Sequence, residues 1–256
     1  MLLIVTRPAA QAAAWVDELR ALGCAAQALP LIEIAAPADP APVRQAWQRL
    51  ADYALLMFVS ANAVQQFFAL APPQWRWPAA LRAGATGPGT SAALRAAGVD
   101  EAAIAEPGAD AGSFDSEALW ARLSDQDWAG RRVLVVRGED GRDWLAQVLR
   151  ERGARVDFVA AYRRQPPQPG PAGLALLAQA LADPAAHLWL FSSSEAVAQL
   201  QALAPLADWS ASAALASHPR IAGAARAAGF GRLALVAPAA VPAVARAVAA
   251  WPSIQS

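Results

Sequence analysis

The chain has 256 residues, enough for two ordinary domains that each bury a hydrophobic core. Its 21 basic residues balance its 21 acidic residues, so no basic field favours a nucleic-acid partner. One cysteine and two histidines provide neither an internal disulfide nor a Cys/His cluster with zinc-site spacing, so no metal is expected.

The first predicted element is a strand over residues 2–6, which ends at Thr6 and Arg7. Its apolar run lacks polar alternation, as is typical of a strand buried on both faces of a parallel sheet. No basic region precedes this short run, so it resembles a first strand rather than a signal peptide. The apolar stretch at 233–245 is too short to span a bilayer and contains two prolines. We therefore expect a cytoplasmic protein without a membrane segment.

A predicted helix follows, with Trp15, Leu19 and Leu22 on one face, and it ends at Gly23. The stretch "QALPLIEI" (27–34) is predicted as the next strand, and a proline-rich break follows at 36–42.

Two strand-to-helix corners are predicted in the middle of the chain. The run "LLMFV" ends at Ser60 and Asn62, and a glycine-rich segment leads to a helix that contains Thr90. Ser and Asn are preferred helix N-caps, so capping alone would also explain Ser60 and Asn62.

The second half begins with a predicted strand over 132–136, followed by the candidate polar residues Arg137, Gly138 and Arg142. The segment "VDFVAAYRR" then carries Tyr162 just before a second proline-rich break. Tyrosine is equally a common strand residue, so a purely structural role stays open. The last predicted corners carry these candidates: Ser192, Ser193, His218 and Arg220.

Segments of the two halves correspond at nearly constant spacing. Phe58 matches Phe191 at an offset of 133, and Arg7 matches Arg137 at an offset of 130. Together with the two proline-rich breaks, these matches indicate a duplicated unit of about 130 residues. Alternating buried strands and helices predict two similar doubly wound parallel α/β domains of flavodoxin- or Rossmann-like type.

In such sheets, ligands bind beyond the carboxyl ends of the strands, where helix N-termini favour anions. The candidate corners all lie at this edge. The glycines near Thr90 lack the spacing of a dinucleotide or P-loop site, so they do not support a nucleotide cofactor. Neither histidine has an evident nucleophile partner, and no catalytic triad can be assembled.

The motifs "VTRP", "FVSANAV", "GPGTSAAL", "VLVVRGEDGRDWLAQVLRERGARV", "YRR" and "FSSSEAV", in this order, resemble the uroporphyrinogen-III synthase family over essentially the whole chain. The resemblance implies two α/β domains joined by a two-stranded connector. Residues 1–35 with 166–256 would form a discontinuous first domain and 38–162 the second, with crossings near 36–42 and 163–171.

The resemblance also implies the activity. A monomeric, cofactor-free lyase would cyclise hydroxymethylbilane, a linear tetrapyrrole with eight carboxylates, to uroporphyrinogen III of the haem pathway, inverting ring D through a spiro intermediate. Tyr162 would assist departure of the substrate hydroxyl as a general acid. Two alternatives stay open: a non-catalytic binder of a small polyanion, and a nucleotide- or flavin-dependent enzyme.

Overall fold

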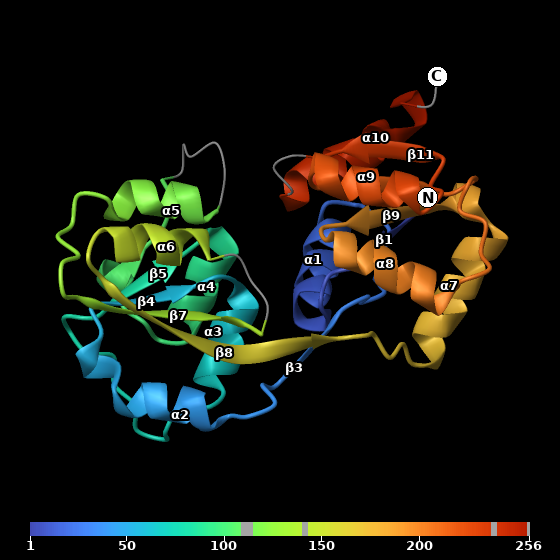
Figure 1. Ribbon diagram of the computed structural model, residues 1–256. Helices are drawn as coiled ribbons and strands as arrows, with labels where there is room; N and C mark the ends of the chain where they lie inside the picture. Colours follow the sequence, from blue (N-terminus) through green and yellow to red (C-terminus); the bar gives the residue numbers. More distant parts are fainter. Residues whose placement is uncertain (109–114, 140–142, 237–239, 255–256) are drawn as a thin grey trace. The chain divides into compact units, whose positions relative to one another are not determined.

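The computed structural model describes residues 1–108, 115–139, 143–236 and 240–254, with side chains to 251. The chain divides into two compact units (Figure 1). Unit 1 contains Met1–Glu33 and Gln165–Ser256, and unit 2 contains Ile34–Arg164.

Unit 1 is built on a five-stranded sheet in the order β11-β10-β9-β1-β2, in which neighbouring strands run parallel. Its strands are β1 (Leu2–Val5), β2 (Ala26–Ala28), β9 (His187–Phe191), β10 (Ala213–Ala216) and β11 (Arg232–Leu235). Its α-helices are α1 (Ala9–Ala21), α7 (Pro171–Ala182), α8 (Ser194–Leu203), α9 (Pro219–Ala227) and α10 (Val241–Ile254).

Unit 2 is built on a six-stranded sheet in the order β3-β8-β7-β4-β5-β6. Its strands are β3 (Glu33–Ala35), β4 (Leu55–Phe58), β5 (Arg82–Ala85), β6 (Ile104–Ala105), β7 (Arg132–Gly138) and β8 (Arg155–Gln165). Its α-helices are α2 (Ala41–Gln48), α3 (Ala61–Phe68), α4 (Pro88–Ala96), α5 (Ser116–Leu123) and α6 (Trp144–Glu151). The five parallel strands β8-β7-β4-β5-β6 repeat the order β2-β1-β9-β10-β11 of unit 1.

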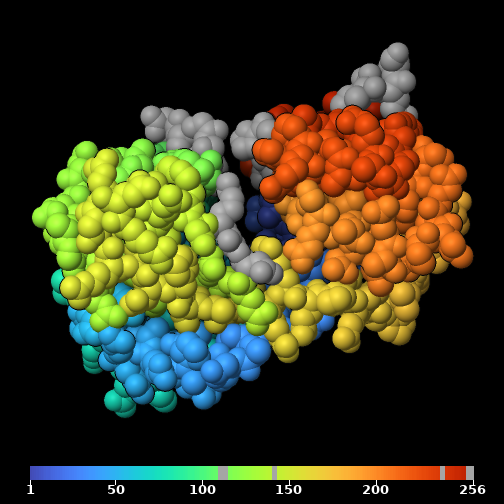
Figure 2. Space-filling view, viewed as in Figure 1, coloured from blue at the N-terminus to red at the C-terminus, as the bar shows by residue number. Residues whose placement is uncertain are grey.

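Helices cover both faces of the sheet in unit 2. Residues of α2, α3 and α4 pack with Leu56 and Phe58 on one face, whereas residues of α5 and α6 pack with Leu55 and Met57 on the other. Successive strand residues point to opposite faces, which is why all four residues of β4 are buried and apolar. The space-filling view shows α5 and α6 in green and yellow covering this side of unit 2 (Figure 2).

The core of unit 1 also occupies both faces of its sheet. Ala12, Val16 and Leu19 of α1 pack with Leu3 and Val5 on one face. On strand β9, the two aromatic residues point to the opposite face and form a cluster with the rings of Trp209 and Phe230. The predicted fold class is confirmed in both units.

Two local predictions were wrong. The stretch 27–34 is not one strand, because the chain leaves β2 at Ala28 and enters β3 only at Glu33. Leu22 does not share the buried face of α1, since it lies just beyond the helix and is 54% exposed. The predicted helix end at Gly23 is correct, and this glycine adopts a positive φ angle of 80°.

Candidate functional site

In unit 1, three neighbouring strands bring predicted site residues to one edge of the sheet. Because β10, β9 and β1 are adjacent and parallel, their carboxyl ends lie side by side. The residues that follow these strand ends are His218 and Arg220 after β10, Ser192 and Ser193 after β9, and Thr6 and Arg7 after β1.

Most hydroxyl and ring atoms at this edge have structural partners. Thr6 is 1% exposed, and its Oγ1 donates a hydrogen bond of 2.6 Å to the carbonyl oxygen of Leu190. Ser193 Oγ accepts from the N–H of Glu195, and His218 Nδ1 accepts from the N–H of Arg220. Ser193 is therefore the N-cap of α8, and His218 is the N-cap of α9.

Arg7 has a different environment. Its guanidinium carbon lies 4.0 Å from the centroid of the Trp15 ring, and Nη1 reaches Gln11 Oε1 at 3.5 Å. Its Nε is buried and has no hydrogen-bond partner. Burial lowers the pKa of Arg7 to about 10. Arg7 is a partly desolvated cation, and an ion pair with a carboxylate would offset the cost of burying its charge.

Unit 2 assembles the corresponding edge from β8, β7, β4 and β5. Ser60 caps α3 by accepting a hydrogen bond from the N–H of Ala63 at 3.2 Å, while Asn62 and Thr90 are buried in the first turns of α3 and α4. The side chain of Tyr162 is 2% exposed, and its hydroxyl oxygen lies 3.4 Å from Ser60 Oγ.

The β7 corner contains two predicted site residues with opposite orientations. Arg137 pairs with Asp143 and lies over the Phe158 ring at 4.5 Å, whereas Gly138 lies against Tyr162. A substrate carboxylate at Arg137 would therefore have to share this cation with Asp143. Arg142 lies outside the described residues.

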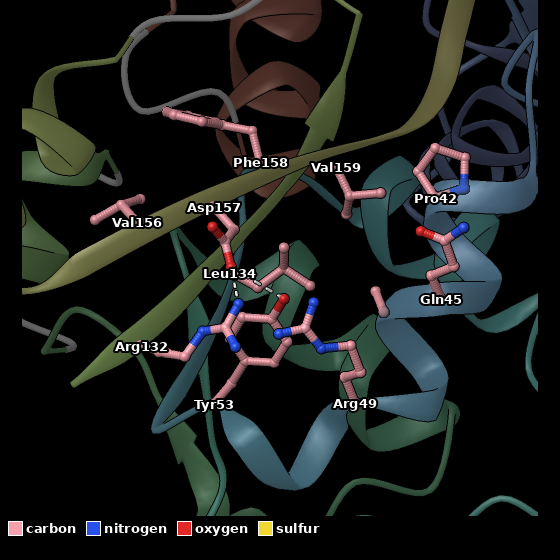
Figure 3. Close-up of a pocket in the computed structure, with 11 residues that line it drawn as sticks. Pro42, Gln45, Arg49, Tyr53, Arg132, Leu134, Val156, Asp157, Phe158 and Val159 are labelled. Atoms are coloured by element: carbon pink, nitrogen blue, oxygen red, sulfur yellow. Dashed lines mark hydrogen bonds and ion pairs between the residues drawn. The ribbon is translucent and has the colours of Figure 1, made fainter.

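The hollow drawn in Figure 3 has a volume of about 440 Å³ and lies between α2 and the first residues of β7 and β8. Arg132 Nη2 and the Tyr53 hydroxyl both donate to Asp157 Oδ2, at 2.7 and 3.2 Å. Burial, followed by the Asp157 charge, raises the pKa of Tyr53. This hollow is at the amino ends of the strands and its charges are paired, so it is distinct from the predicted site.

Among the described residues, no group of three or more His, Cys, Asp and Glu side chains is arranged to hold a metal ion. None of the described helices is long and apolar enough to cross a membrane.

Gly84, one of the glycines near Thr90, lies within β5. An added Cβ would meet side-chain atoms of Leu119 and Leu55 at 3.3 Å, so close packing explains why a glycine occupies this position.

The family model of uroporphyrinogen-III synthase, HemD, matches residues 13–242. The chain belongs to the uroporphyrinogen-III synthase family. It is 33% identical over 217 residues to the uroporphyrinogen-III synthase of Synechococcus elongatus, covering 82% of this chain and 78% of that protein. It is 36% identical over 169 residues to the Salmonella typhimurium enzyme, covering 64% of this chain and 65% of that protein.

Two solved structures share the fold of this synthase family. A mutant uroporphyrinogen III synthase of Thermus thermophilus is 17% identical, with a TM-score of 0.57 and coverage of 100% of this chain and 98% of that chain. The Helicobacter pylori uroporphyrinogen-III synthetase is 16% identical, also with a TM-score of 0.57. The match covers 98% of this chain and 100% of that chain.

Thr86 and Gln11 were not among the residues predicted from the sequence. Thr86 Oγ1 donates to the carbonyl of Val59, just as Thr6 donates to Leu190 on the neighbouring strand of unit 1. A threonine directly after a strand was the available signal for Thr86. Gln11 has no comparable signal, because its contact with Arg7 depends on the turn that joins β1 to α1.

Proposed function

We propose that this chain is a uroporphyrinogen-III synthase that cyclises hydroxymethylbilane to uroporphyrinogen III. The observation that carries this proposal is the family match over residues 13–242. We further propose that it acts as a cytoplasmic monomer, needs no cofactor, and comprises the two domains expected from its crossings near 36–42 and 163–171. The overall reaction releases one molecule of water.

Catalysis of this reaction depends on orienting the substrate and stabilising its charges more than on a strong nucleophile in the enzyme. The two ends of a flexible chain must meet in one geometry, which is where enzymes gain most from fixing the reactants. Helix N-termini and the guanidinium groups of Arg7 and Arg220 would hold substrate carboxylates. The burial of the Arg7 charge, whose cost a carboxylate would offset, supports this assignment.

Tyr162 is proposed as the general acid. Its hydroxyl would transfer a proton to the departing substrate hydroxyl, which leaves as water while the electron pair of the ring A nitrogen completes an azafulvenium cation. Ring D then attacks through its substituted carbon, and the spiro intermediate fragments and recloses with ring D inverted. The proton that is released on final ring closure would return to the Tyr162 oxygen. Tyr162 is supported by its place near the end of β8 and its contact with Ser60.

Product analysis tests the function directly. Hydroxymethylbilane generated in situ by its upstream enzyme should yield isomer III in the presence of this protein, and the oxidised isomers can be separated chromatographically. Isomer I alone, formed at the spontaneous rate, would contradict the synthase function and favour a non-catalytic binder of polyanions.

The general-acid role is tested by Tyr162→Phe, which should slow formation of isomer III by about a hundredfold, the usual scale of acid assistance. Tyr53→Phe is a matched control because it removes the other tyrosine hydroxyl, at the opposite ends of the strands. An unchanged rate in Tyr162→Phe would remove this residue from the mechanism.

A further inference from the structure

Strand β8 contains an irregularity just before Tyr162. Arg137 of β7 pairs with Ala160, but the next residue, Gly138, pairs with Tyr162, so Ala161 is an extra residue in β8. Such a bulge breaks the alternation of side chains between the two faces of a sheet. Ala161 and Tyr162 consequently both belong to the core cluster on the side of α2, α3 and α4. In a regular strand, Tyr162 would point to the opposite face.

The Tyr162 ring lies directly over Gly138. A Cβ added at Gly138 would be 3.0 Å from Cζ, 3.1 Å from Cε2 and 3.4 Å from the hydroxyl oxygen of Tyr162. These atoms form the hydroxyl end of the ring. Gly138 does not have a positive φ angle, so no left-handed backbone conformation requires glycine here. The requirement is space for the tyrosine ring.

Ser60, which follows β4, contacts the hydroxyl of Tyr162 across β7, the strand that lies between β4 and β8. Its Oγ accepts the N–H of Ala63 at 3.2 Å and lies 3.4 Å from the Tyr162 oxygen. Because Ser60 Oγ already accepts a hydrogen bond, its own hydrogen is available to Tyr162. A tyrosine hydroxyl that accepts from Ser60 retains its hydrogen for a third group, and the same contact would stabilise a tyrosinate oxygen.

We propose that Gly138 and Ser60 are positioning residues for the Tyr162 hydroxyl: Gly138 leaves the space that seats the ring, and Ser60 orients and supports the oxygen. This inference rests on the proposed function, because it assigns both residues to the proton transfer from Tyr162. It also gives Gly138 a role other than contact with the substrate.

A kinetic cycle separates positioning from a general structural effect. Gly138→Ala should lower kcat by about tenfold to a hundredfold, the range expected for a displaced catalytic group, with little change in KM. In a Tyr162→Phe background the same substitution should have almost no effect on kcat. Phenylalanine keeps the crowded ring and lacks only the hydroxyl, so an equal loss in both backgrounds would overturn the proposal.

Ser60→Ala provides a second, independent variant if Gly138→Ala does not fold. It should lower kcat in the parent but much less in Tyr162→Phe, and Ser60→Thr should restore most of the rate because threonine retains a hydroxyl that can cap the helix. Gly223→Ala is the matched glycine control, because this exposed position in α9 has open space around an added Cβ. Failure of Ser60→Thr to rescue would contradict the hydroxyl role.

A spectroscopic measurement is independent of activity. The chain contains two tyrosines, so 3-fluorotyrosine labelling should produce two fluorine resonances, which Tyr53→Phe assigns. Gly138→Ala and Ser60→Ala should shift the Tyr162 resonance, and Gly223→Ala should not. An unshifted resonance would overturn the proposal even in an active enzyme. A protein that forms only isomer I would refute the proposed function, while the fluorine shifts would still decide the seating of Tyr162.

Discussion

Thr6 and Arg7 are neighbours at the end of β1, but they differ in whether their buried polar atoms have hydrogen-bond partners. Thr6 donates to the carbonyl of Leu190 and so joins β1 to β9, which satisfies a buried hydroxyl. Arg7 instead has a buried Nε without a partner. The sequence predicted both as substrate-binding residues because both follow a strand, and that role stays a prediction for each. The structural partner of Thr6 makes Arg7 the stronger candidate.

Replacing Arg7 should separate stability from binding. Because burial lowers the pKa of Arg7 to about 10, the folded state disfavours the charged form, and stability is reduced at any pH below that value. Arg7→Met should therefore raise Tm at pH 7 by a few degrees. It should also raise KM by about tenfold to a hundredfold, because a charged donor to the substrate is lost.

The Tm difference between Arg7→Met and the parent should shrink as the pH rises through about 10, where the parent loses the penalised charge. Calorimetry at pH 7 and pH 10.5 measures it. Arg122→Met removes an exposed arginine of α5 and serves as the control. A lower Tm for Arg7→Met at pH 7 would show that its contact with Trp15 outweighs its desolvation.

At the scale of elements, β11 begins against the loop before β10. A Cβ added at Gly231 would be 2.0 Å from the carbonyl oxygen of Ser210, and a backbone atom cannot move aside as the end of a side chain can. The start of β11 therefore requires glycine for close approach of two backbone segments.

Two glycine substitutions should consequently have opposite effects. Gly231→Ala should destabilise the protein by about 3 kcal/mol through overpacking. Gly223→Ala should stabilise it by about 0.5–1 kcal/mol, because alanine is favoured within a helix. Chemical denaturation of the two variants and the parent measures both values. Similar midpoints for the two variants would contradict the close approach at Gly231.

At the scale of the whole molecule, the repeat boundary and the unit boundary differ. The first half of the sequence supplies β1 and β2 to the sheet that contains β9, and the second half supplies β7 and β8 to the sheet that contains β4. Each half therefore gives its first two strands to the unit built mainly from the other half.

Cutting the chain at the repeat boundary should abolish independent folding. Fragment 1–130 lacks β7, which pairs with β4, and β9, which pairs with β1; fragment 131–256 lacks β4 and β1, the same two partners. The continuous segment 34–164 keeps β4 to β8 together and should unfold cooperatively by itself. Urea titrations followed by near-ultraviolet circular dichroism compare the three. Cooperative unfolding of fragment 1–130 would refute this strand exchange.

The amino-acid sequence by itself determined the elements and their polar ends. Buried strands require uninterrupted apolar runs, and the chain must become polar where each strand leaves the core, so Ser60, Arg7 and their counterparts could be located from local pattern. The internal repeat indicated that both halves share one architecture, and the family motifs indicated the activity.

Only the tertiary structure decided which of these groups meet. The strand order β8-β7-β4 brings Tyr162 of β8 near Ser60 at the end of β4, and the extra residue Ala161 turns the tyrosine to the face on which they meet. Neither feature has a local sequence signature, because strand order and register depend on pairing between segments about a hundred residues apart. Close packing then selects a residue as small as Gly138, for a reason that becomes visible only when the Tyr162 ring is in place.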